Sequence, residues 1–140
     1  MVLDFYYRIW VDGIVKMRSL PRNKGMWKFY GMVFMTLAMS FNLLLLMAIL
    51  QRNVFKKKFW SIDAKIFNDN LLDAFTKFFI LYALIPLLLN YFFIFWNSRY
   101  KTLLIKYPKT FNGKLFVAYT IGSLFLPFIS IFVAYLCGVK

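Results

Sequence analysis

Residues 29–50 read FYGMVFMTLAMSFNLLLLMAIL and contain no charged side chain. A helix needs about 20 apolar residues to cross the hydrocarbon layer of a bilayer, which is about 30 Å thick. Two further stretches, residues 78–96 (FFILYALIPLLLNYFFIFW) and 115–138 (LFVAYTIGSLFLPFISIFVAYLCG), are also uncharged. The sequence therefore predicts an all-α integral membrane protein with three transmembrane helices.

The overall composition supports the same fold class. Apolar residues make up 62% of the 140 residues, whereas soluble domains contain about 45–50%. A soluble fold of this length could not bury so much apolar surface, so lipid or partner helices must cover it.

We expect a single membrane domain over residues 1–140. Its parts in order are an N-terminal interfacial region (1–28), span 1 (29–50), an outer loop (51–70), span 2 (71–97), a basic cytoplasmic loop (98–114) and span 3 (115–138). Asn70 is predicted to cap the second helix, and Asp73 to pair with Lys77 one turn later. That helix is expected to continue beyond the lipid until Tyr107, because Pro108 is the first residue that breaks it.

Residues 3–18 predict an additional, amphipathic helix. Its apolar and aromatic side comprises Leu3, Tyr6, Tyr7, Trp10, Ile14 and Met17, and its opposite side comprises Asp4, Arg8, Asp12 and Lys16. Such a helix is suited to the membrane interface. The alternative is that it packs on a partner protein or on the cytoplasmic loop.

The net charge of +13 comes from basic residues that flank the apolar stretches. Cations in these positions meet lipid headgroups, so we expect an anionic bilayer as partner and no nucleic acid. The side of the N-terminus carries 11 Lys and Arg residues and the other side 7, counting Lys77. The positive-inside rule then places the N-terminus in the cytoplasm and the C-terminus outside. The predicted headgroup contacts are Trp10, Arg99, Lys101, Lys106, Lys109 and Lys114.

Polar and small residues inside the spans are candidates for helix packing. Asn42 and Asn90 are interpreted as hydrogen-bonded clamps between helices, with a substrate or ion path as the alternative. In span 3 a row of small residues, broken by Leu126, recurs every four positions, and such rows let helices approach closely. Its members are Ala118, Gly122, Ser130 and Ala134; chance spacing is the alternative.

Residues for catalysis are scarce. The chain has no His, one Cys and five acidic residues, all Asp, and it lacks phosphate-binding and dinucleotide-binding glycine motifs. Asp63, Asp69 and Asp73 share one loop and could hold a metal or act as acid and base, but loop solvation and helix capping are favoured. Cys137 is expected to be a buried apolar residue. We predict no cofactor, no metal and no enzymatic activity.

The stretch FFIFWNSRYKTLLIKY (residues 92–107) and the opening LDFYYRIWVDGIVK (residues 3–16) resemble small three-span inner-membrane proteins of Bacteroides-like bacteria, a group without an assigned activity. The resemblance covers most of the chain and implies a bacterial inner membrane. It implies no catalytic residues.

Three functions remain as hypotheses. The first is an accessory or assembly subunit, or a homo-oligomer, that acts through helix association. The second is a small oligomeric transporter or channel with a polar stripe formed by Thr36, Ser40, Asn42, Asn90 and Ser130. The third is a membrane enzyme acting on lipid-linked substrates through the aspartates of the outer loop and Lys77.

Overall fold

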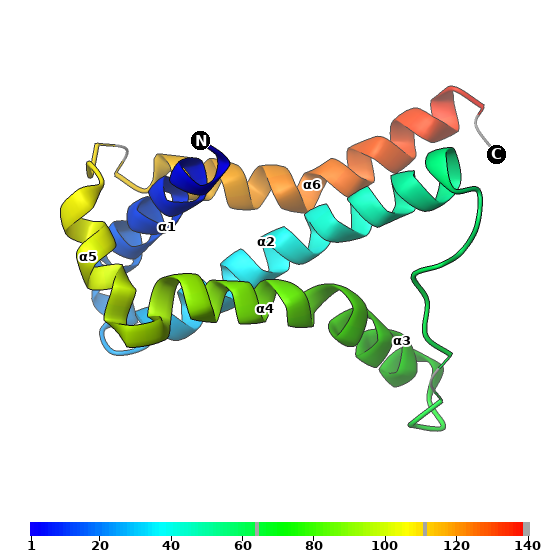
Figure 1. Cartoon of the computed structure of the whole chain (residues 1–140), viewed down its shortest axis with the longest axis horizontal. Coiled ribbons are helices and arrows are strands. Elements are labelled where there is room, and N and C mark those ends of the chain that lie inside the picture. Colours follow the sequence, from blue (N-terminus) through cyan, green and yellow to red (C-terminus); the bar gives the residue numbers. More distant parts are fainter. Residues whose placement is uncertain (64, 111, 139–140) are drawn as a thin grey trace.

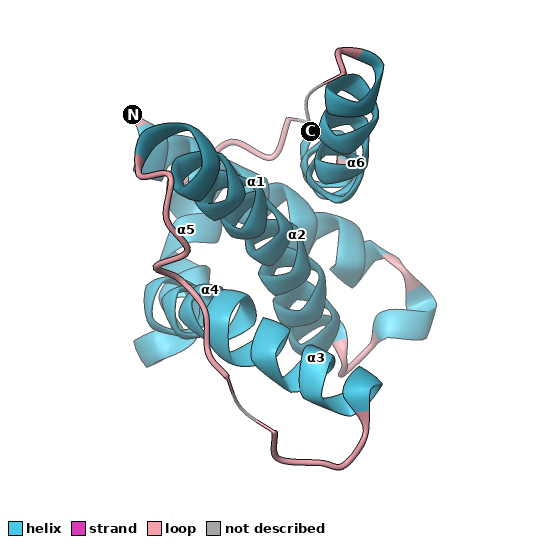
Figure 2. Cartoon of the chain, turned by 90° about the vertical axis from the view of Figure 1, so that its right-hand side faces the viewer, coloured by secondary structure: helices cyan, strands magenta, loops and turns pink. Residues whose placement is uncertain are grey.

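The computed structural model describes residues 1–63, 65–110 and 112–138, and within these ranges the chain is helical and has no strands (Figure 1 and Figure 2). Its elements in order are α1 (Val2–Ser19), η1 (Pro21–Asn23), α2 (Trp27–Ile49), η2 (Leu50–Val54), α3 (Asn70–Phe78), η3 (Phe79–Ala83), α4 (Leu84–Asn90), η4 (Tyr91–Phe95), η5 (Trp96–Ser98), α5 (Arg99–Lys106) and α6 (Lys114–Leu136). Here η2, η3 and η4 are turns of π-helix, and η1 and η5 are turns of 3₁₀-helix.

Three helical stretches are long and apolar enough to cross a membrane, which confirms the predicted all-α class with three potential spans. They are Trp27–Val54, Asn70–Lys106 and Lys114–Leu136. α2 lies in the middle, with α6 on one side and α3 and α4 on the other (Figure 2). α1 packs against α2, α5 and α6 near the end of the bundle where α5 lies (Figure 1).

The second span does not continue straight into α5. Asn97 and Ser98 both have left-handed backbone conformations, with φ of 51° and 54°, which side chains other than glycine adopt at a cost. The chain therefore changes direction here, and α5 stands at a steep angle to α4 (Figure 1). The prediction of an unbroken helix to Tyr107 is wrong at this point, although α5 does end just before Pro108.

The start of the second span also differs from the prediction. Asp69, not Asn70, is the N-cap of α3, since its carboxylate accepts hydrogen bonds from two backbone N–H groups of the first turn at 2.8 and 3.3 Å. Asp73 does not pair with Lys77. Its carboxylate accepts hydrogen bonds from two backbone N–H groups of the preceding loop, both at 2.9 Å. Both aspartates thus fix the entry of the chain into the helix.

Pro86 lies inside α4 and has no N–H to donate, so a carbonyl in the preceding turn loses its helical partner. The π-helical turn η3 lies directly before α4. The indole of Trp60, in the loop between η2 and α3, donates a hydrogen bond to the Leu81 carbonyl in that turn, at 3.2 Å. This loop is therefore attached to the second apolar helix where proline disturbs it.

The core of the molecule lies around α1. Residues 9–14 of this helix are all buried, so neighbouring helices cover it on every side. Asp12, on the predicted charged side of this helix, is buried as well, and its side chain is only 3% exposed. The buried apolar residues that form the core are Ile9, Trp10, Val11, Ile14, Met17, Met35, Ile94, Tyr100, Leu103, Tyr107 and Phe116.

The C-terminal half of α6 has few neighbours. Phe128 and Phe132 are each 62% exposed, and Tyr135 is 81% exposed. Cys137 is also exposed, so the expectation that this thiol is buried is wrong. These apolar side chains are free to contact lipid or another helix.

Candidate functional site: polar contacts between the helices

Asn90 joins three helices through one side chain. Its carbonyl oxygen accepts hydrogen bonds from the Tyr6 hydroxyl at 2.7 Å and the Trp10 indole at 3.1 Å. Its amide nitrogen donates to the Thr36 hydroxyl at 3.2 Å. The Asn90 side chain is 0% exposed, and burial raises the pKa of Tyr6, which keeps its hydroxyl protonated as a donor. The network connects α1, α2 and α4.

Asn42 makes a second, smaller set of contacts between α2 and α6. Its amide nitrogen donates to the Ser123 hydroxyl at 2.9 Å and to the Tyr119 hydroxyl at 3.2 Å. Both asparagine side chains therefore bind polar side chains of other helices, although Asn42 also borders a hollow between α2 and α4 that is lined mainly by apolar residues.

Asp12 caps α6 from a different helix. One carboxylate oxygen accepts a hydrogen bond from the Gly113 N–H at 2.7 Å, and the other accepts from the Phe116 N–H at 3.0 Å. The first turn of a helix has unpaired N–H groups and a partial positive charge, so a carboxylate stabilises it. No side chain next to α6 in sequence performs this function. Asp12 therefore holds α1 against the start of the third span.

Asp4 makes the outermost contact of α1. Its carboxylate accepts a hydrogen bond from the Tyr107 hydroxyl, which follows α5, at 2.6 Å. This bond lowers the pKa of Asp4 and raises the pKa of Tyr107. Among the described residues there is one ion pair, between the N-terminal amine and Asp4.

The small residues of α6 do not share one environment. Ala118 and Gly122 are exposed, and a Cβ added at Gly122 would meet no atom within 4 Å. Ser130 and Ala134 are half-buried and border a hollow beside α2. A helix has 3.6 residues per turn, so a row with a spacing of four rotates by about 40° at each step. The row therefore begins on the free side of α6 and ends on the side of α2.

The predicted headgroup contacts divide into two groups. Trp10 is 0% exposed and bound to Asn90, so its predicted contact with lipid headgroups is wrong. The amphipathic pattern cannot distinguish a ring that faces lipid from a ring that faces protein. The basic members of the set are all exposed: Arg99, Lys101, Lys106, Lys109 and Lys114.

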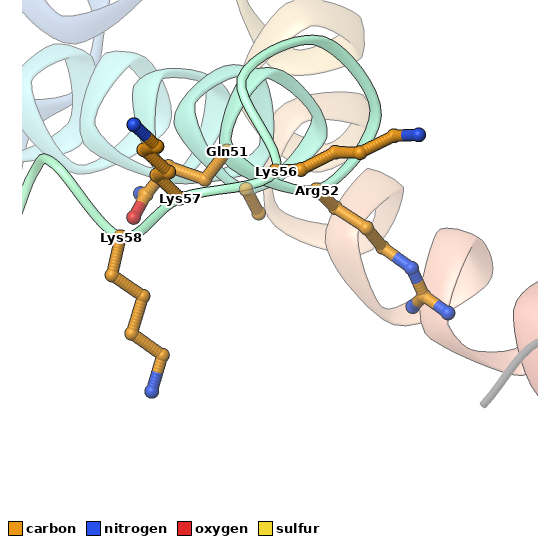
Figure 3. A pocket seen from close by; sticks show the side chains of 6 residues that line it. Gln51, Arg52, Lys56, Lys57 and Lys58 are labelled. Carbon is orange, nitrogen blue, oxygen red and sulfur yellow. The ribbon is translucent and has the colours of Figure 1, made fainter.

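A basic hollow of 440 Å³ lies at the other end of α2, lined mainly by Gln51, Arg52, Lys56, Lys57 and Lys58 (Figure 3). The charged ends of Arg52, Lys57 and Lys58 point in different directions. Lys56 extends to the same side as Arg52, whereas Lys57 and Lys58 point away from it (Figure 3).

An apolar groove of 390 Å³ lies between parts of α2 and the second span, which contact each other elsewhere. It is lined by Phe29, Met32, Val33, Thr36, Leu37, Phe75, Phe78, Phe79, Ala83 and Leu87. No set of three or more acidic, His or Cys side chains that could hold a metal occurs in the described part of the chain.

Comparisons with protein-family models, with curated proteins and with solved structures found no match to this chain. The resemblance to inner-membrane proteins of Bacteroides-like bacteria thus stays a prediction.

Proposed function

We propose that this chain is a non-enzymatic membrane protein that acts by association, either as an accessory or assembly subunit or as a homo-oligomer. The observation that carries the proposal is the free face of α6 around Gly122, where a Cβ would meet nothing within 4 Å. Ala118, one turn earlier, is exposed as well. Helices pack closely in membranes where small residues leave such room.

The proposed location is a bacterial inner membrane, with the N-terminus in the cytoplasm and the C-terminus outside. The support is the excess of basic residues on the side of the N-terminus, 11 against 7. Asp4 and Asp12, the acids on that side, both accept hydrogen bonds within the fold.

The two alternative functions have less support. A pore needs polar side chains that are available to a permeant, but Asn42 and Asn90 bind neighbouring helices, and the hydroxyls of Ser40 and Ser130 donate to backbone carbonyls of their own helices. An enzyme using the loop between η2 and α3 would need several free carboxylates, but those of Asp69 and Asp73 accept backbone hydrogen bonds, which leaves the exposed Asp63 alone.

Crosslinking in native membranes, together with mass measurement of the purified chain in nanodiscs, tests the association. We expect a defined oligomer or a stoichiometric partner, and we expect Gly122→Ile to reduce it because the added side chain blocks close approach. Ala74→Ile, a similar change at an exposed small residue of α3, is the matched control. A chain that is monomeric and without a partner in both measurements contradicts the proposal.

A further inference from the structure

Two cations lie against the same aromatic ring at the start of α2. The Arg18 guanidinium carbon is 4.8 Å from the centre of the Trp27 ring, and the Lys28 ammonium is 5.7 Å from that centre. Lys28 also lies 5.0 Å from the centre of the Tyr100 ring. We propose that Arg18 and Lys28, positioned by Trp27 and Tyr100, form a binding site for the phosphate of an anionic lipid headgroup.

The aromatic rings that position these cations are themselves fixed. The ring centres of Trp27 and Tyr100 are 5.3 Å apart in an edge-to-face arrangement, and Phe95 lies 6.3 and 6.0 Å from these two rings. Tyr100 is only 6% exposed. A cation on a fixed ring loses less conformational entropy on binding than a mobile surface side chain does. The site is therefore partly organised before the lipid arrives.

The charges of Arg18 and Lys28 are available to an anion from outside the chain. Within the described ranges, neither Arg18 nor Lys28 forms an ion pair with a carboxylate. The two acids on this side of the protein, Asp4 and Asp12, are engaged by Tyr107 and by the start of α6. Both cations are exposed, so an approaching phosphate can reach them.

The position of the site favours lipid over other anions. Trp27 is the first residue of α2, and no charged residue follows Lys28 until Arg52. Tryptophan and lysine at the end of a span lie at the level of the headgroups. Beside them, Met26 and Phe29 are 52% and 59% exposed, which gives acyl chains an apolar surface next to the two cations. A headgroup phosphate with its acyl chains fits both parts of this surface.

Binding of phosphatidylglycerol to the purified full-length chain in uncharged detergent, counted by native mass spectrometry, tests the site. We expect phosphatidylglycerol to bind more tightly than phosphatidylcholine. The double variant Arg18→Gln/Lys28→Gln should lose about thirtyfold in phosphatidylglycerol affinity, as expected for two cations near an anionic surface. Lys57→Gln/Lys58→Gln, which removes two exposed cations of the basic hollow, is the matched control and should keep the affinity.

Trp27→Leu provides a second variant that retains both charges but removes the ring, and its affinity should fall severalfold. The site is refuted if both double variants lose affinity equally, because the attraction is then diffuse. It is also refuted if inorganic phosphate displaces the lipid at similar concentration, because the ligand is then a free anion. The lipid site does not depend on the proposed association. In the same spectra, the mass of each complex gives the number of protein chains separately from the number of bound lipids.

Discussion

The carboxylate of Asp12 accepts a hydrogen bond from the backbone N–H of Gly113, 101 positions later in the chain, at 2.7 Å. The contact joins the N-terminal helix to the beginning of the third span. It makes α1 a part of the helical bundle and gives α6 the cap that its own sequence lacks.

The first prediction concerns this cap. Asp12→Ala should lower the free energy of unfolding by about 2–3 kcal/mol, because it leaves two buried N–H groups without an acceptor. Unfolding in mixed micelles, followed by circular dichroism, measures the change. Asp63→Ala, at an exposed aspartate, is the control. Equal stability of the two variants would show that the cap does not contribute.

The second prediction compares the two asparagines of the spans. Asn90→Leu should destabilise the fold by about 2–3 kcal/mol, since three partners on two other helices lose their hydrogen bonds. Asn42→Leu should cost only about 1 kcal/mol, because its contacts are half-buried. The same unfolding assay gives both values. A larger loss of stability for Asn42→Leu than for Asn90→Leu would contradict this ranking of the two networks.

The hydrogen bond between Asp4 and Tyr107 determines how the contact of α1 with α5 depends on pH. The lowered pKa of Asp4 means that its bond with Tyr107 stabilises the fold above the ordinary carboxyl pKa of 3.8 and is lost as the pH falls through the lowered value. The raised pKa of Tyr107 means that the contribution of its hydroxyl persists below pH 10.0 and is lost as the pH rises through the raised value. The contact of α1 with α5 should therefore be insensitive to pH between these limits.

Carboxyl NMR titration of selectively labelled protein tests the pair. In Tyr107→Phe the pKa of Asp4 should rise, because the hydroxyl that stabilises its charged form is gone. Tyr30→Phe removes a hydroxyl elsewhere and should leave the Asp4 titration as it is. An unchanged Asp4 pKa in Tyr107→Phe would mean that the bond does not form in solution.

The fourth prediction compares two glycines. A Cβ at Gly13 would lie 2.5 Å from the ring of Phe116, whereas a Cβ at Gly122 would meet nothing within 4 Å. Gly13→Ala should cost about 1–3 kcal/mol through overpacking. Gly122→Ala should be neutral or stabilise the monomer by up to about 1 kcal/mol through helix propensity. If Gly13→Ala has the same free energy of unfolding as the wild-type chain, α1 is not packed on α6 as described.

The three helices that could span a membrane were predictable because an uncharged stretch of about 20 residues is a local property of the sequence. The sequence predicted that a polar N-cap residue begins the second span, but it did not determine which residue this is. Asp69 and Asn70 are both good N-cap residues, and the choice between them depends on where the loop lies. The break at Asn97 gives no clear local signal, because asparagine also occurs within helices.

The buried network around α1 could not be predicted. The pattern of Trp10 and Tyr6 shows that one side of the helix avoids water, but it does not show whether lipid or protein covers that side. The function of Asp12 depends on a partner 101 positions away. Asn112, just before span 3, is itself a good N-cap residue type, so nothing in the local sequence indicates that Asp12 supplies the cap.

The proposed topology has three spans and a cytoplasmic N-terminus, and cysteine labelling can establish it. Single cysteines introduced by Lys24→Cys, Lys57→Cys or Lys109→Cys in a Cys137→Ser background are treated with a membrane-impermeant maleimide in intact cells. We expect labelling at position 57 without permeabilisation, and labelling at positions 24 and 109 only after it. Labelling of positions 57 and 109 from the same side would contradict it, because the second span would then not cross the membrane.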